Sequence, residues 1–151
     1  MANLVTNIAK GRFIHYATLP AADDALIAVV LEATGLEADG TLIDHDTLAD
    51  LLAGTSTEQT TMGRQTMTNV VVTVDDVGDL ASFTFDAITW PAAAGNATGK
   101  LIIAYDPDTT GGTDADLIPL TVHDFTTTPD GNDVVATPDS LGVGRALGPC
   151  P

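Results

Sequence analysis

The chain has 151 residues, of which 21 are Asp or Glu and only 5 are Lys or Arg, so its formal net charge at pH 7 is −16. Acidity of this size disfavours nucleic acid and anionic membranes as partners, because both are bound through Lys and Arg. The hydrophobic fraction of 44% excludes a disordered acidic chain, which would be poor in apolar residues.

The length fits one folded domain. A chain of about 150 residues buries enough surface to fold without a metal or a disulfide, and the single Cys150 has no partner within the chain. No segment has the apolar length of a signal peptide or a membrane span, so we expect a soluble protein made in a cytoplasm. We divide the chain into an N-terminal arm with the first strand (residues 1–22), a β-rich body (23–138) and a flexible C-terminal tail (139–151).

Residues 13–19 and 25–33 are the first two predicted strands. The earlier segment has no clear helical period and runs into turn residues. The later segment is a continuous apolar run, rich in β-branched residues and bounded by Asp24 and Gly35, which is typical of a buried strand. Its period alone does not distinguish it from a buried helix.

One short helix is predicted near residues 46–53. Asp44 or Asp46 can cap its N-terminus, and Gly54 can end it. The apolar face of this helix consists of Leu48, Leu51 and Leu52. We expect this face to pack against the end of a sheet.

Residues 55–68 have no apolar period and are predicted to form a long loop. The β-like runs that follow, separated by Gly, Pro and Asp turns, cover residues 70–74, 82–90, 100–105, 117–123 and 133–137. Phe83 and Phe85 alternate with polar residues, as in a half-solvated antiparallel sheet. The predicted fold class is mainly β: an antiparallel β-sandwich or small barrel with one short helix and extended terminal arms.

The densest group of carboxylates lies between the third and fourth of these runs. Its acidic residues are Asp106, Asp108, Asp114 and Asp116. The loop begins like a calcium-binding EF-hand, with Asp-x-Asp and then Gly111 at the sixth position. The match fails at Thr110 and at Leu117, which stands where the EF-hand has glutamate. A solvated acidic turn is the stronger interpretation, and we assign no metal and no cofactor.

No catalytic motif is present. His15, His45 and His123 are too scattered for a zinc site, and no Gly-x-Ser-x-Gly elbow accompanies them. The indole of Trp90 is expected to pack under the following loop. We therefore predict a protein that is not an enzyme, although 21 acidic residues leave open a catalytic pair that no motif reveals.

Several short strings together resemble small virion proteins of long-tailed bacteriophages, in particular head decoration, or cement, proteins. They are residues 58–64, Trp90 with 94–97, 105–109 with 112–114, and 119–121 with 123–125. The resemblance implies a β-rich body without catalytic residues, present on the virion as trimers at local threefold positions of the capsid surface. It also implies extended termini that lie on the major capsid protein.

The terminal segments combine apolar and basic residues, which a protein this acidic should not leave exposed unless something covers them. We expect them to bind the major capsid protein. The candidate partner-binding residues are Leu4, Val5, Ile8, Lys10, Arg12, Phe13, Arg64, Arg145 and Leu147. The alternative is that residues 10–19 are an ordinary first strand and that residues 138–151 are disordered.

Three other functions stay open at this point. Phage tail proteins and head-fibre proteins share this size and β content. A calcium-dependent adhesion or binding module could use residues 55–68 or 106–116. An enzyme would need a deep polar pocket, which a small filled sandwich seldom has.

Overall fold

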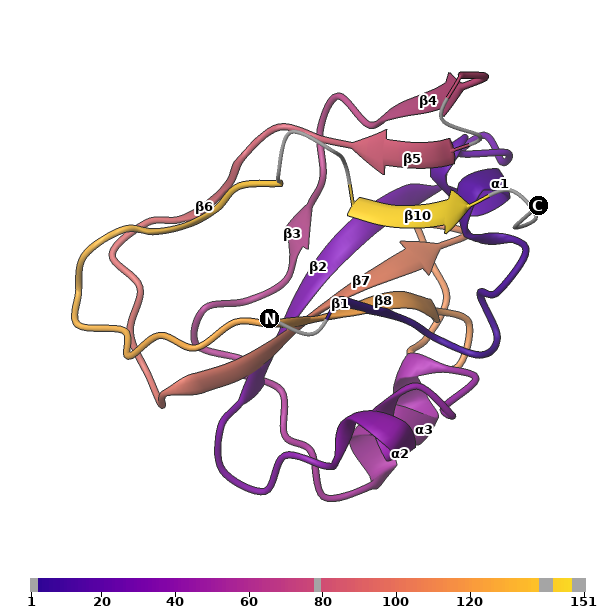
Figure 1. Cartoon of the computed structure of the whole chain (residues 1–151). Coiled ribbons are helices and arrows are strands. Elements are labelled where there is room, and N and C mark those ends of the chain that lie inside the picture. The colour runs from indigo at the N-terminus through magenta and orange to yellow at the C-terminus, as the bar shows by residue number, and fades with distance from the viewer. Residues whose placement is uncertain (1–2, 78–79, 139–142, 148–151) are drawn as a thin grey trace.

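The computed structural model describes residues 3–77, 80–138 and 143–147, and this part of the chain is mainly β, with 33% strand and 11% helix (Figure 1). The strands are β1 (Asn3–Val5), β2 (Ala25–Glu32), β3 (Gln65–Thr66), β4 (Val71–Asp75), β5 (Leu80–Thr84), β6 (Ile88–Trp90), β7 (Thr98–Asp106), β8 (Ile118–Asp124), β9 (Val134–Ala136) and β10 (Val143–Leu147). The helices are α1 (Phe13–Ala17), α2 (Asp39–Leu42) and α3 (Leu48–Ala53). The mainly β fold class is confirmed, and within the described residues the sheets are antiparallel and none of them closes into a barrel.

A five-stranded antiparallel sheet in the order β1-β8-β7-β2-β3 forms the centre of the molecule. Both faces of this sheet are covered, which explains the continuous apolar sequence of β2. Leu26 and Val30 face one core cluster, while Val29 and Leu31 face another. The prediction of a buried strand at residues 25–33 is confirmed.

Helices α2 and α3 cover one face of this sheet (Figure 1). The predicted helix is confirmed as α3, but the capping prediction is wrong. Thr47 caps α3 because its Oγ1 accepts a hydrogen bond from the Asp50 amide at 3.1 Å, whereas neither Asp44 nor Asp46 does so. Gly54 follows the last residue of α3, as predicted.

The opposite face is covered by α1 and by a three-stranded sheet in the order β10-β5-β4. The predicted strand at residues 13–19 is wrong, because residues 13–17 form α1 and bury Phe13 and Ala17. Three short helices therefore stand in the described chain where one was predicted. Phe83 and Phe85 are both buried in this cluster, which confirms their predicted common face.

The predicted strand at residues 82–90 is interrupted, since β5 ends at Thr84 and β6 begins at Ile88. Strand β6 pairs with β9 in a separate two-stranded sheet. The other predicted strands match β4, β7, β8 and β9. The predicted loop at 55–68 is irregular except for β3 and a bridge between Glu58 and Leu31.

Both terminal segments contribute strands to the chain's own sheets. Asn3–Val5 pairs with β8, and Val143–Leu147 pairs with β5. This differs from the extended N-terminal arm and the flexible tail that we expected. The rest of the predicted tail lies outside the described residues. Within the described chain, no helix is long and apolar enough to cross a membrane.

Candidate functional site

The candidate partner-binding residues of the N-terminal segment (Leu4, Val5, Ile8, Lys10, Arg12 and Phe13) form two groups. One group faces the core, and the other faces solvent. Leu4 and Val5 are partly buried in β1 and pack against different core clusters, because neighbouring strand residues point to opposite faces. Phe13 is only 4% exposed and contacts the ring of Phe83. These three residues stabilise the chain's own fold, so Phe13 is not available to a partner in this structure.

The exposed candidates lie in the turn between β1 and α1, residues 6–12. The turn is fixed at its start by the Thr6 amide, which donates to the Leu120 carbonyl at 3.0 Å, and by the buried Ala9. Ile8 is 38% exposed, and Lys10 and Arg12 are exposed beside it. We call Ile8, Lys10 and Arg12 the cationic turn.

Lys10 and Arg12 of the cationic turn form no ion pair with any side chain that the structure describes. Lys10 donates to the neutral Asn7 side chain at 2.5 Å. By contrast, Lys100 is buried and lies 2.6 Å from Asp39 and 2.5 Å from Asp124. Burial alone would lower the pKa of Lys100, but the hydrogen bonds to these two carboxylates outweigh burial and raise it.

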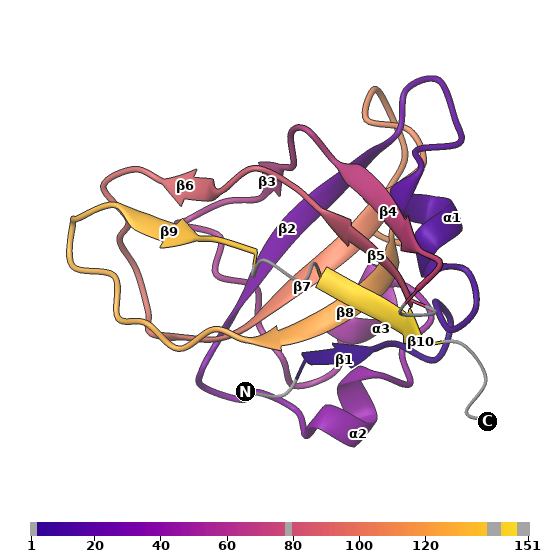
Figure 2. The same ribbon diagram turned by 45° about the horizontal axis from the view of Figure 1, so that its top comes forward.

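The fold brings together the two terminal segments that were predicted to bind the major capsid protein. Strands β1 and β10 lie side by side although about 140 residues separate them (Figure 2). Arg145 and Leu147 belong to β10, which pairs with β5 and contains an irregularity between Val143 and Arg145. The two ends of the chain therefore contribute to one region of the molecule.

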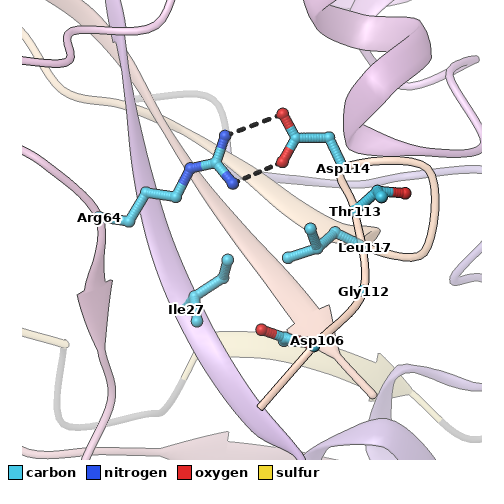
Figure 3. A pocket seen from close by; sticks show the side chains of 8 residues that line it. Ile27, Arg64, Asp106, Gly112, Thr113, Asp114 and Leu117 are labelled. Carbon is cyan, nitrogen blue, oxygen red and sulfur yellow. Dashed lines mark hydrogen bonds and ion pairs between the residues drawn. The ribbon is translucent and has the colours of Figure 1, made fainter. Parts of the chain in front are cut away.

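Arg64 has its donors engaged within the chain. Its guanidinium binds both oxygens of Glu58, at 2.8 and 2.7 Å. It also binds both oxygens of Asp114, at 2.6 and 3.1 Å (Figure 3). Hydrogen bonds to Glu58, and then those to Asp114, raise the pKa of Arg64. The same hydrogen bonds lower the pKa of Asp114. Arg64 thus connects the loop at 55–68 to the acidic loop at residues 106–116. It is therefore not a free partner-binding residue in this structure.

We expect Arg64→Met to lower the free energy of unfolding at pH 7 by about 1–2 kcal/mol, because the ion pairs are partly exposed. The pKa of Asp114 is depressed in the folded state, so its contribution exists above the unfolded pKa of about 4 and is lost as pH falls through the folded pKa. Urea denaturation from pH 7 to pH 2 should show the difference from wild type shrinking on the acid side. Arg12→Met, at an exposed cation, should change stability by less than about 0.5 kcal/mol, and an equal loss in both variants would contradict the assignment.

A hollow of about 260 Å³ adjoins this ion pair (Figure 3). Its lining residues include Ile27, Arg64, Asp106, Gly112, Thr113, Asp114 and Leu117. A divalent cation in this hollow would face the guanidinium of Arg64, which opposes its binding.

The acidic loop uses its carboxylates to fix its own turns. The Asp108 carboxylate accepts from the Thr110 amide at 3.0 Å and from the Thr110 hydroxyl at 2.6 Å, and these bonds lower the pKa of Asp108. The Asp116 carboxylate accepts in the same way from Thr113, and Asp106 accepts from the Asp108 amide. Among the residues that the structure describes, no three His, Cys, Asp or Glu side chains are placed to hold a metal ion.

The histidines and Trp90 have local partners. His45 lies 3.1 Å from Glu37, which also accepts from the Ser56 hydroxyl, and His123 lies 2.8 Å from the Thr121 hydroxyl. Trp90 is 1% exposed and shares its core cluster with Ala93 of the following loop, and its indole N–H donates to the Gly63 carbonyl in the preceding loop.

Comparison of the chain with protein-family models, with curated proteins and with solved structures found no match. The function therefore has to be argued from the residues and their geometry.

Proposed function

We propose that this chain is a virion structural protein that binds the outer surface of the major capsid shell and stabilises it, as a decoration or cement protein. In this proposal the protein is a non-catalytic homotrimer on the capsid surface. It is motivated by the resemblance to such proteins of residues 58–64, Trp90 with 94–97, 105–109 with 112–114, and 119–121 with 123–125. On the described surface, the cationic turn is the feature that best supports this proposal.

The distribution of charge suits a protein that is displayed on a shell. A net charge of −16 keeps many neighbouring copies soluble and repels anionic surfaces. The same charge would oppose attachment to an acidic partner surface unless a local patch reverses it. Lys10 and Arg12 supply such a patch, and Ile8 adds apolar surface next to them.

The partner expected for this patch is a carboxylate-bearing surface of the major capsid protein. Interface cations paired with carboxylates mainly set the association rate, the register and the dependence on salt. An exposed aliphatic side chain at the same place adds apolar burial when the two surfaces meet. Attachment should therefore weaken as ionic strength rises.

The test is attachment of purified protein to undecorated phage particles, measured by sedimentation and by electron microscopy. Lys10→Gln with Arg12→Gln should weaken attachment about ten- to a hundredfold. Thr126→Glu with Thr128→Glu is the matched control, because it changes the net charge by the same amount at exposed positions of another loop. Circular dichroism should be unchanged in both variants.

Equal attachment of the two variants would contradict the cationic turn as the anchor. Binding to tails or fibres instead of heads would contradict the decoration function and favour a tail or head-fibre protein. Substitution is preferable to deleting residues 1–9, because that deletion also removes β1 and the buried Thr6.

A further inference from the structure

Lys100 is a buried primary amine that the proposed attachment to the capsid does not use. It is 7% exposed and belongs to β7, which lies inside the central sheet between β8 and β2. Strand alternation places its side chain on the same face as Ile102, the face that α2 and α3 cover. Lysine is rarely buried, because its charge then loses the solvation of water. A buried amine beside carboxylates is also a nucleophile beside acyl groups.

Two carboxylates from different elements meet this amine. Asp124 stands opposite Lys100 in the register of β7 with β8, and its Oδ1 lies 2.5 Å from Nζ. Asp39 is the first residue of α2, and its Oδ1 lies 2.6 Å from the same nitrogen. A nitrogen that is hydrogen-bonded to a carboxylate oxygen has the carboxyl carbon one bond beyond that oxygen. The fold therefore holds Nζ close to a carbon that it can attack, and such fixed pairs reach effective molarities of about 10⁵–10⁸ M.

We propose that Lys100 and Asp124 join through an intramolecular isopeptide bond, with Asp39 carrying the proton between them. Asp124 is the acyl group because it and Lys100 are fixed on neighbouring strands. Asp39 comes from a helix of four residues, and its side chain is more exposed than that of Asp124, at 43% against 37%. It is therefore the better placed of the two to exchange protons.

The reaction balances without any further reagent. The ammonium of Lys100 gives one proton to the Asp39 carboxylate, and the free amine attacks the Asp124 carboxyl carbon while Asp39 passes that proton to an Asp124 oxygen. Asp39 then takes a second proton from the bonded nitrogen. It gives this proton to the leaving oxygen as the carbon–oxygen bond breaks. An amide and one water molecule are formed, and Asp39 is again a carboxylate.

The charges at the site favour the product but slow its formation. Burial would lower the pKa of Lys100, but the hydrogen bonds to Asp124 and Asp39 outweigh burial and raise it. The amine is therefore free only when its proton has moved to a neighbouring carboxylate. The completed bond removes the charges of Lys100 and Asp124 from a largely dry site, where ions lack the solvation of water. We expect a slow reaction that occurs once in each folded chain.

The bond would close a loop from residue 100 to residue 124, which contains the acidic loop. It would also link β7 to β8 covalently in the centre of the sheet. This modification goes beyond the proposed function and does not depend on it, because no partner and no capsid take part. Failure of the bond would leave the attachment through the cationic turn untouched.

The experiment is mass spectrometry of the intact, denatured wild-type protein after the folded protein has been kept for several days at pH 7. The mass should be lower than that of the sequence by one water molecule. Trypsin does not cut after an acylated lysine. Digestion of the denatured chain should therefore give the fragment 65–145 in place of fragments 65–100 and 101–145. Fragmentation of this peptide should locate the link between Lys100 and Asp124.

Three variants assign the roles, each with its fold checked by circular dichroism. Lys100→Arg keeps the positive charge but cannot form the amide, so it should have the full mass of its sequence. Asp124→Asn should lose ammonia instead of water and reach the same final mass as the cross-linked wild type. Asp39→Ala should slow bond formation about a hundredfold, because it lacks the group that carries the proton. Lys10→Arg is the matched control at an exposed lysine, and it should still lose one water.

An unshifted wild-type mass with complete cutting after Lys100 would overturn the proposal, and this result does not depend on whether any variant folds. Loss of water that persists in Lys100→Arg would also overturn it, because the water would then come from another site, such as an imide at Asp130 and Gly131. Loss of water instead of ammonia in Asp124→Asn would contradict Asp124 as the acyl group.

Discussion

Replacing Trp90 with alanine is expected to lower the free energy of unfolding by about 3–5 kcal/mol. Trp90 is 1% exposed, and its ring lies 5.7 Å from that of Phe125, between centroids. Its indole N–H donates to the Gly63 carbonyl at 3.0 Å. The substitution therefore removes a large apolar side chain from the core and leaves a carbonyl of the 55–68 loop without this donor. Urea denaturation followed by circular dichroism measures the loss.

Two variants separate the ring from its hydrogen bond. Trp90→Phe retains much of the apolar volume but lacks the N–H, so we expect a smaller loss of about 1–2 kcal/mol from the unpaired Gly63 carbonyl. Thr89→Ala changes the exposed neighbour on β6 and should alter stability by less than about 0.5 kcal/mol. A loss in Trp90→Ala no larger than that in Thr89→Ala would contradict the role given to the indole.

Strands β2, β7 and β8 of the central sheet could be predicted because their signal is local. The apolar run at residues 25–33 is too continuous for a surface strand, and the structure explains it by covering both faces of β2. The alternation of Phe83 and Phe85 likewise gives a common face whatever lies opposite it. These patterns depend on the period of the side chains and not on which distant segment packs against them.

Helix α1 could not be predicted in this way. Its sequence, Phe-Ile-His-Tyr-Ala, is rich in residues that favour strands, and no side-chain cap begins it. What selects the helix is tertiary packing: Phe13 and Ala17, four residues apart, are both buried on one face. Propensity is a weak guide for five residues held by a core that the sequence does not reveal.

The candidate site was predictable in composition but not in arrangement. The sequence places Ile8, Lys10 and Arg12 close together, and they are exposed on one turn. It does not reveal that Arg64 binds Asp114, because 50 residues separate them and many other acidic residues compete. The pairing of β10 with β5 is non-local in the same way, which is why the tail was expected to be flexible.

Replacing Phe13 with alanine is expected to lower the free energy of unfolding by about 3 kcal/mol or more, although the sequence alone places Phe13 among the candidate partner-binding residues. Phe13 is 4% exposed, and its ring lies 6.3 Å from that of Phe83, between centroids. The contact joins α1 to β5, so its loss should loosen the three-stranded sheet from the core. Urea denaturation should show a lower midpoint with an unchanged cooperative transition.

Ile8→Ala is the matched variant on the same segment, since Ile8 is 38% exposed. It should change stability by less than about 0.5 kcal/mol but weaken attachment to undecorated particles, because its apolar surface is available to a partner. Phe13→Ala, assayed where it is still folded, should attach as the wild type does. The opposite pattern, with Phe13→Ala stable but unable to attach, would mean that Phe13 leaves the core to bind the capsid. Measuring stability and attachment on both variants therefore decides which face of the segment acts in folding and which acts in binding.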